Sequence, residues 1–177
     1  MTPVEALAKN GLIADAITSY KISRSAEGLD DGEITFGGLD TQKFNSTTLA
    51  TVDNVSTLGF WEAKVDAASV DDKDLGISGR TAILDTGTTI ILAPAADAAA
   101  VHAAIPGSQS DGQGGFTIPC TTTAVVALTF GSTSFSIDPR DLSFAPASPG
   151  NATGDCISGI AALPAGGSAT QWLVRFG

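Results

Sequence analysis

Residues 82–92 place one acidic residue between two short apolar runs, and this stretch constrains the fold more than any other part of the chain. Residues 83–84 precede Asp85 and residues 90–92 follow it, and each run has the length and composition of a buried strand. Gly87 allows a tight turn between the runs. The stretch therefore predicts a strand–turn–strand unit with Asp85 at its tip, where a carboxylate is costly to bury unless it is hydrogen-bonded.

Hydroxyl groups surround this predicted turn. Thr86, Thr88 and Thr89 carry them, and the backbone after Asp85 adds N–H donors. Three interpretations are open at this point. The first is a solvated turn, since Asp and Gly are common in turns. The second is a phosphate loop, since Asp-x-Gly-Thr-Thr is similar to the first phosphate motif of actin-like ATPases and sugar kinases, and to the P-type ATPase loop, where Lys usually follows the Asp. The third is an aspartic protease loop, Asp-Thr-Gly-Thr/Ser.

Most of the chain predicts short β-strands separated by turn residues. The clearest is residues 60–65, whose side chains alternate between two faces. Residues 71–74 predict a charged turn, and residues 108–115 predict a flexible loop. The other segments expected to be extended are residues 13–22, 33–36, 47–52, 116–120, 125–130, 133–137, 142–145, 155–160 and 171–174.

Two short helices are predicted among these strands. Residues 2–11 begin with the capping box Thr2-Pro3-Val4-Glu5, with proline at the first helical position. Residues 94–105 begin at Pro94 and carry an Ala-rich run. The predicted fold class is therefore all-β with two short helices. This disfavours the phosphate interpretation, because actin-like ATPases and sugar kinases alternate long helices with strands.

His102 lies in the second predicted helix and is the only histidine of the chain. We expect it to be an ordinary surface residue without a catalytic role, because no Cys or Ser nucleophile with a recognisable companion motif lies nearby.

Composition and charge exclude several functions. The chain has 177 residues, enough for one ordinary domain, and 43% of them are apolar. Its net charge of −10 disfavours binding to nucleic acid or to an anionic membrane. No apolar stretch has the length of a membrane helix, and the first twenty residues do not form a secretory signal.

Two cysteines and three sequons indicate the compartment. Cys120 and Cys156, with a single histidine, do not form a zinc motif, so we expect one disulfide worth about 3–4 kcal/mol, and neither metal nor cofactor. Asn45, Asn54 and Asn151 each begin an Asn-x-Ser/Thr triplet and are glycosylation candidates. Together these features predict a secreted or secretory-route protein, including a vacuolar one.

Several landmarks in order give the chain a resemblance to one family. Gly32-Glu33-Ile34-Thr35-Phe36-Gly37-Gly38-Leu39-Asp40 is similar to the Gly-Glu-Leu-Thr-Phe-Gly-Gly-x-Asp segment of pepsin-like aspartic endopeptidases (family A1) of the fungal secreted type. Residues 2–13 and 19–24 resemble the helix and strand at that family's lobe junction. Phe60-Trp61-Glu62-Ala63 resembles its Tyr-Trp strand, and residues 82–89 resemble its second Asp-Thr-Gly loop. Cys120 and Cys156 fall where its second lobe has a disulfide.

The resemblance implies a fold, an activity and a set of site residues. It implies a C-terminal lobe of the bilobal double-psi β-barrel fold, with residues 1–24 as the end of the first lobe and the junction, and residues 25–177 as the C-terminal lobe. It implies hydrolysis of peptide or protein substrates in acid by two carboxylates that share a proton and hold a water. Asp85 would be the second catalytic aspartate. Thr86 would lock the two loops together, Thr88 would hydrogen-bond Asp85, and Gly87, Thr88 and Thr89 would line the substrate cleft.

Two departures from the family pattern shape what we expect of this chain. No second Asp-Thr-Gly or Asp-Ser-Gly is present, so the first lobe is expected to be missing and the isolated chain to be inactive. Arg175 stands where the family has a glycine near its last strand, and we expect it to be too large for that place and the lobe to be incomplete at its C-terminus. The alternatives are an inactive lobe that binds peptide or a partner, and a homodimeric protease with one Asp85 from each chain.

Overall fold

The computed structural model describes residues 1–24 and 27–175, which fall into two compact units, one covering residues 1–50 and the other beginning at Thr51. The predicted lobe boundary at residue 25 and the last two residues of the predicted lobe lie outside the described residues. Among the described residues no helix is long and apolar enough to cross a membrane. We describe the two units separately.

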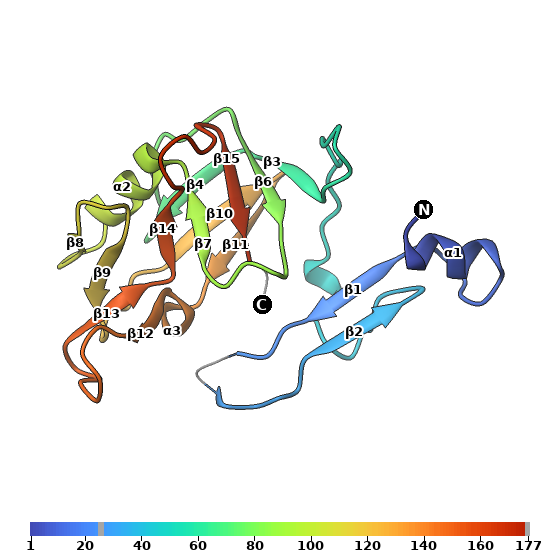
Figure 1. The fold of residues 1–177 in the computed structure, drawn as a ribbon, viewed down its shortest axis with the longest axis horizontal. Coiled ribbons are helices and arrows are strands. Elements are labelled where there is room, and N and C mark those ends of the chain that lie inside the picture. Colours follow the sequence, from blue (N-terminus) through green and yellow to red (C-terminus); the bar gives the residue numbers. More distant parts are fainter. Residues whose placement is uncertain (25–26, 176–177) are drawn as a thin grey trace. The chain divides into compact units, whose positions relative to one another are not determined.

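The first unit contains one helix and a two-stranded ribbon. Helix α1 (Pro3–Lys9) has the predicted capping box, with Thr2 and Glu5 each bonding the other's backbone. Strands β1 (Thr18–Lys21) and β2 (Glu33–Phe36) pair in antiparallel register (Figure 1). The extended segment predicted at residues 47–52 is wrong. A 3₁₀ turn, η2 (Ser46–Thr48), forms instead, because the Asn45 side chain caps it by accepting from the Thr47 N–H.

The second unit is built from three sheets (Figure 1). The five-stranded sheet has the order β14-β7-β15-β6-β3, in which β15 runs parallel to β6 and β14 parallel to β7. The others have the orders β11-β10-β4-β5 and β12-β13-β9-β8, with antiparallel neighbours. The strands are β3 (Glu62–Val65), β4 (Ala67–Val70), β5 (Lys73–Asp74), β6 (Arg80–Leu84), β7 (Ile91–Ala93), β8 (Gln109–Ser110), β9 (Phe116–Pro119), β10 (Val126–Phe130), β11 (Thr133–Ile137), β12 (Ser143–Pro146), β13 (Asp155–Ser158), β14 (Ile160–Ala162) and β15 (Gln171–Val174).

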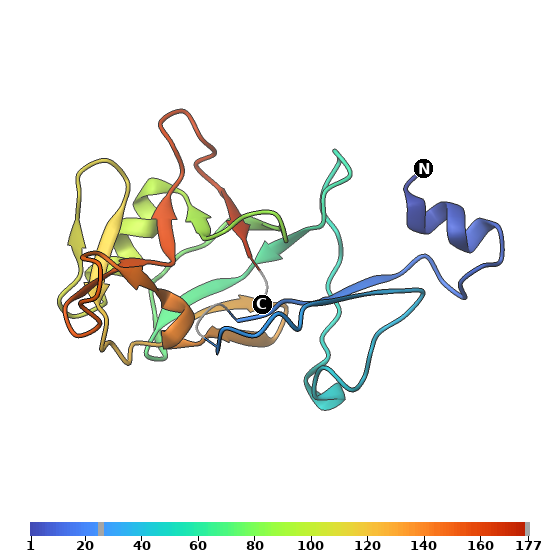
Figure 2. The same cartoon turned by 60° about the horizontal axis from the view of Figure 1, so that its bottom comes forward.

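The all-β class is confirmed, and so are the two predicted helices. Helix α2 (Ala95–Ala103) follows β7 and contacts β14, and α3 (Pro139–Leu142) forms a single turn after Asp138. The strands that the structure describes lie in separate open sheets, so the barrel implied by the resemblance does not close. Figure 2 shows the loop between β14 and β15 projecting from the second unit.

Three short strands lie where no strand was predicted, and the single strand predicted at residues 155–160 forms two, β13 and β14, in different sheets. β4 lies where no strand was expected, β5 takes up half of the predicted charged turn, and β8 lies in the predicted flexible loop. Their sequences carry little strand signal, and pairing with β10, β4 and β9 determines them. The strand predicted at residues 60–65 begins at Glu62, which leaves Trp61 66% exposed while Ala63 and Val65 are buried.

The core of the second unit forms where the buried faces of its strands meet. Alternation decides which side chains enter it: Ala63 and Val65 of β3, Ala82 of β6, and Trp172 and Val174 of β15 are buried. The predicted disulfide is confirmed, because Cys120 and Cys156 are joined and connect the end of β9 to β13.

A buried ion pair ties α2 to the five-stranded sheet. Asp97 on α2 is almost fully buried and accepts two hydrogen bonds from Arg80 of β6, at 2.6 and 2.8 Å. The indole N–H of Trp172 on β15 donates to the same carboxylate at 3.0 Å. Three elements that are distant in sequence therefore converge on one carboxylate.

The expectation that His102 is a surface residue is wrong. It is only 3% exposed, and its ring stacks on Phe116 with centroids 3.8 Å apart. Its Nδ1 lies 2.7 Å from the Ala98 carbonyl oxygen, which can only accept, so Nδ1 carries the hydrogen. Its Nε2 then accepts from the Ser158 hydroxyl at 2.9 Å. The neutral imidazole has both nitrogens satisfied, and an Ala-rich helix gave no sign of this because Ser158 is remote in sequence.

We expect His102 to make the protein less stable as the pH falls below about 6.5. Burial lowers the pKa of His102 below its ordinary value. Between these two pKa values the unfolded chain binds a proton that the folded chain does not, so acid favours unfolding. His102 is the only histidine, and carboxylates titrate mostly at lower pH, so the loss between about pH 7 and pH 5 isolates it.

Urea unfolding at these two pH values, compared between the native chain and His102→Phe, checks this expectation. Phenylalanine retains the stacking but leaves the Ser158 hydroxyl hydrogen without its acceptor, although the hydroxyl oxygen still accepts from the Ile160 N–H at 3.1 Å. The variant should therefore be less stable at both pH values by about 1–3 kcal/mol. Its stability should nevertheless change less between them. An equal change in the two proteins contradicts the prediction.

Candidate active site

Asp85 lies immediately after β6, and its position is determined by two neighbouring segments. Its backbone N–H donates to the Val174 carbonyl of β15 at 2.9 Å, and the N–H of Leu84 donates to the Trp61 carbonyl at 2.8 Å. β7 begins at Ile91, so the turn that follows Asp85 has strands of the same sheet on both sides. The predicted strand–turn–strand unit is confirmed.

The carboxylate of Asp85 is held by donors from its own turn. Oδ1 accepts from the Gly87 N–H at 2.9 Å, and Oδ2 accepts from the Thr88 hydroxyl. These bonds, that of Thr88 first and that of Gly87 second, lower the pKa of Asp85 below its ordinary value, against the opposing effect of partial burial. Asp85 therefore remains ionised further into acidic solution than an ordinary aspartate.

Position 87 favours glycine because a side chain there would lie very close to the Asp85 carboxylate. A Cβ there would lie 3.2 Å from Asp85 Oδ1, which is tighter than most such contacts. Its φ is not in the left-handed region, so backbone freedom is not what requires glycine. A side chain at this position would displace the carboxylate from the Gly87 N–H.

The other predicted site residues lie on the same turn, but they do not bind the carboxylate. Thr86 and Thr89 are both exposed. Within the part of the chain that the structure describes, the Thr86 hydroxyl makes no hydrogen bond to another residue. The turn thus places Asp85, Gly87 and Thr88 together and leaves Thr86 and Thr89 facing solvent.

The expectation that Arg175 is too large for its position is wrong. Arg175 follows Val174, whose carbonyl binds the Asp85 N–H, so it lies directly behind the turn. Its guanidinium Nη1 donates to the Thr89 carbonyl at 3.1 Å, and its side chain is half-buried. The long side chain extends along the turn, so the backbone is not pushed away from it.

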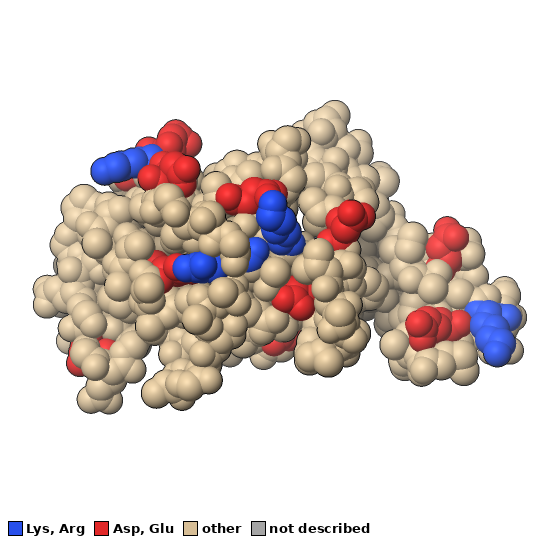
Figure 3. Space-filling view, turned by 90° about the horizontal axis from the view of Figure 1, so that it is seen from above, with Lys and Arg blue, Asp and Glu red and all other residues tan. Residues whose placement is uncertain are grey.

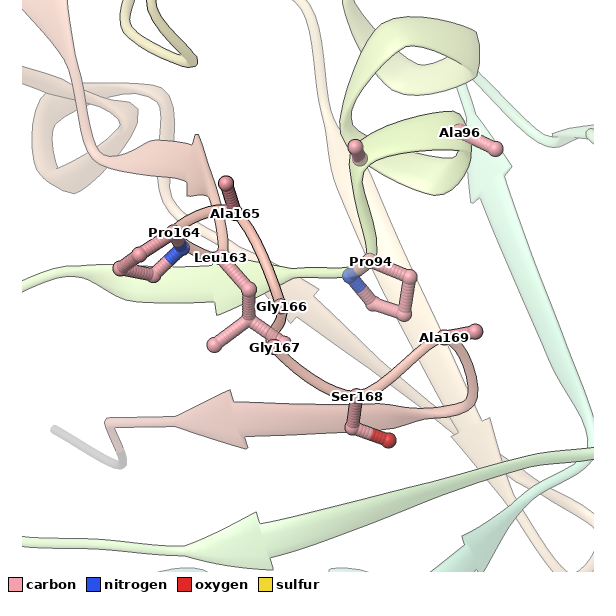
Figure 4. Close-up of a pocket in the computed structure, with 10 residues that line it drawn as sticks. Pro94, Ala96, Leu163, Pro164, Ala165, Gly166, Gly167, Ser168 and Ala169 are labelled. Atoms are coloured by element: carbon pink, nitrogen blue, oxygen red, sulfur yellow. The ribbon is translucent and has the colours of Figure 1, made fainter.

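A shallow hollow of about 260 Å³ lies at the other end of the five-stranded sheet. Pro94 and the loop from Leu163 to Ala169 line it, and Figure 4 shows mostly apolar side chains around it. Because β15 runs parallel to β6, with Gln171 opposite Thr81 and Val174 opposite Leu84, this loop and Asp85 are at opposite ends of the strands. The hollow is therefore separate from the Asp85 turn.

Among the described residues, many charged side chains lie in ion pairs. Figure 3 shows acidic and basic side chains lying beside one another on the face it draws. Lys43–Glu33 and Lys64–Asp66 are two of the ion pairs among the described residues. Within residues 1–24 and 27–175, no three His, Cys, Asp or Glu side chains gather in a way that could hold a metal ion.

Comparison with known proteins identifies the family of this chain. The model of the family described as eukaryotic aspartyl protease matches residues 1–173. A probable aspartic-type endopeptidase CTSD of Arthroderma benhamiae is 37% identical over 142 residues, covering 79% of this chain and 27% of the relative. Rhizopuspepsin-1 of Rhizopus niveus is 37% identical over 164 residues (91% and 40%), and an aspartic protease of Phaffia rhodozyma is 31% identical over 175 residues (95% and 40%).

The chain thus spans between about a quarter and two fifths of the length of these relatives. The family match includes both the first unit and the Asp85 turn. It agrees with the resemblance predicted from the sequence and with a carboxylate held on an Asp-Thr-Gly-Thr turn. The chain therefore belongs to the eukaryotic aspartyl protease family.

Proposed function

We propose that this chain is the second lobe of a two-lobed aspartic endopeptidase in which Asp85 is one of two catalytic carboxylates. The observation that carries the proposal is the hydrogen bonding of Asp85, since each carboxylate oxygen accepts one donor and stays partly free. In this proposal residues 1–24 are the end of the first lobe and the lobe junction, and residues 25–177 are the second lobe.

Two carboxylates and a water are sufficient for peptide hydrolysis. Each oxygen of Asp85 retains a lone pair beyond the one that Gly87 or Thr88 occupies, so it can hold a water or share a proton with a second aspartate. The ionised carboxylate takes a proton from the water while the water oxygen attacks the peptide carbonyl carbon, and the protonated carboxylate donates to the carbonyl oxygen. The tetrahedral intermediate then collapses as its amide nitrogen is protonated and the C–N bond breaks.

The remaining residues of the turn have proposed roles that match their exposure. The Thr86 hydroxyl is exposed and without a partner among the described residues, as a group that bonds a second loop across a lobe interface must be. Gly87, Thr88 and Thr89 form the surface beside the carboxylate and would contact the substrate backbone on the non-primed side of the cleft.

The second aspartate must come from outside the Asp85 turn, because the chain has one Asp-Thr-Gly motif. In our proposal a first lobe supplies it. A second copy of this chain is the alternative source, and a lobe that binds peptide or a partner without cutting is the alternative function.

We further propose that the protein is secreted or resides in an acidic vacuolar compartment, as a glycoprotein. Three observations support this: the disulfide, the exposed asparagines of all three sequons, and the lowered pKa of Asp85. Asn45, Asn54 and Asn151 are the candidate glycan acceptors.

A chimera tests the proposed activity. The segment of rhizopuspepsin-1 that matches this chain is replaced by residues of this chain, and cleavage of casein is measured at about pH 3–5, with and without pepstatin. We expect pepstatin-sensitive cleavage. Asp85→Asn should reduce it by about 10²–10⁴-fold, because a general acid–base group is lost. Asp53→Asn, which removes an exposed carboxylate elsewhere in the same unit, should leave it unchanged.

The isolated chain provides the discriminating control. We expect no cleavage by it, because a single Asp85 lacks a proton-sharing partner. Cleavage that grows with the square of the chain concentration and disappears in Asp85→Asn would establish the homodimer instead. A folded chimera that binds pepstatin but does not cut would favour the binding lobe.

A further inference from the structure

Few of the described hydrogen bonds hold the turn that carries Asp85. Within the turn, Gly87 and Thr88 bond the Asp85 carboxylate, and at its ends Asp85 and Ile91 bond the carbonyls of Val174 and Gly159. Between these ends, the described hydrogen bonds include only one from outside the turn, which runs from Arg175 to the Thr89 carbonyl. Arg175 therefore acts on the part of the turn that is otherwise least restrained.

Arg175 suits this role because it and its neighbour Val174 contact opposite ends of the same turn. Its neighbour Val174 accepts the N–H of Asp85 at the start of the turn, and its guanidinium reaches Thr89 near the end. Two consecutive residues, Val174 at the end of β15 and Arg175 just after it, thus connect both ends. A guanidinium is always charged and carries several donors in a rigid plane, so its bond to a carbonyl is stronger than a neutral one.

Arg175 also differs from the other cations of the chain. Most lysines and arginines lie against a carboxylate, as Arg80 lies against Asp97. Arg175 has no carboxylate within ion-pair distance among the described residues. Lys9 and Lys73 share this property but are exposed, whereas Arg175 is half-buried. Its interaction with the turn is therefore not a by-product of an ion pair.

We propose that Arg175 is a positioning residue for the catalytic carboxylate, which it stabilises in its bonded geometry by holding the Thr89 end of the turn. The inference rests on the proposed function only in that Asp85 is the catalytic group. It requires that loosening Thr89 loosens Gly87 and Thr88 as well, since these residues are consecutive in one short turn.

The test is a titration of the Asp85 side-chain carboxyl carbon by NMR in the full chain, which needs no peptidase activity. Arg175→Met retains the aliphatic stem and removes the donors. We expect it to raise the pKa of Asp85 toward its ordinary value and to speed amide hydrogen exchange at Gly87 about two- to tenfold, the equivalent of one lost hydrogen bond. Arg175→Lys, which keeps a charged donor, should restore part of both effects. Thr88→Val removes a direct bond to the carboxylate, so its effects on the pKa of Asp85 and on Gly87 exchange are the reference against which those of Arg175→Met are compared.

Salt and a second variant separate positioning from charge. Loss of a cation alone could raise the pKa of Asp85, but that effect is screened at about 0.5 M salt, whereas a change in the geometry of the turn is not. Arg140→Met removes the same charge from α3 and should leave Gly87 exchange unchanged. If Arg175→Met leaves both the pKa of Asp85 and the exchange of Gly87 unaltered, or shifts the pKa only at low salt, the proposal is overturned. If Asp85 titrates as expected in these variants but the chimera does not cleave casein, that result counts against the proposed function and leaves the role of Arg175 intact.

Discussion

Arg80→Met should lower the free energy of unfolding by about 3–5 kcal/mol, the effect of removing one partner of a buried ion pair. Asp97 would remain almost fully buried after the change, and the indole N–H of Trp172 would be its only described side-chain partner. A carboxylate in that situation must either keep its charge without compensation or bind a proton.

Urea unfolding at about pH 7 measures this effect. Lys64→Met is the matched control, because it removes a cation from an ion pair whose lysine is 68% exposed, and it should leave the free energy of unfolding nearly unchanged. The double variant Arg80→Met/Asp97→Leu should recover much of the loss, since no buried charge remains. If Arg80→Met costs no more than Lys64→Met, the network does not stabilise the fold.

Removal of the disulfide should cost about 4 kcal/mol in the chain-entropy model. Cys120 and Cys156 are separated by 36 residues, so the bond restricts a long loop of the unfolded chain. It also connects β9 to β13 within one sheet. Alanine is the appropriate replacement at both positions, because Cys156 is buried and a serine hydroxyl there would need a partner.

The measurement compares the double variant Cys120→Ala/Cys156→Ala with the native chain, each with and without a reducing agent. Reduction should lower the free energy of unfolding of the native chain by nearly as much as the double substitution does. It should not change the free energy of unfolding of the variant. A loss below about 1 kcal/mol would mean that the unfolded chain is already compact around this loop.

The parts of the fold that local sequence predicted are those whose interactions are local. The capping box of α1 and the turn at Asp85 each involve residues a few positions apart, so their side-chain types and spacing were sufficient. The disulfide was expected because two cysteines and one histidine left few other possibilities. In the site, the bonds of Gly87 and Thr88 to Asp85 are equally local, but three threonines offered a hydroxyl, and the resemblance to the family implied Thr88.

The predictions that failed concern contacts between distant residues. His102 was expected on the surface, and its partner Ser158 lies 56 positions away. Strand β4 has a weak pattern and exists because β10 and β5 pair with it. Arg175 was expected to disrupt the turn, and the position of Thr89 86 residues earlier decided otherwise. No window of sequence contains both partners of these contacts.

The sequence by itself therefore determined that a single aspartate stands on an Asp-Thr-Gly turn between two buried strands of a β-rich chain. It also placed the candidate donors for the carboxylate on that turn, and the two that bind lie within three residues of Asp85. Only the tertiary structure decided what supports the turn from behind. Parallel pairing of β15 with β6 brings Val174 to the N–H of Asp85 and Arg175 to Thr89, and that pairing depends on the packing of Trp172 into a core to which all three sheets contribute.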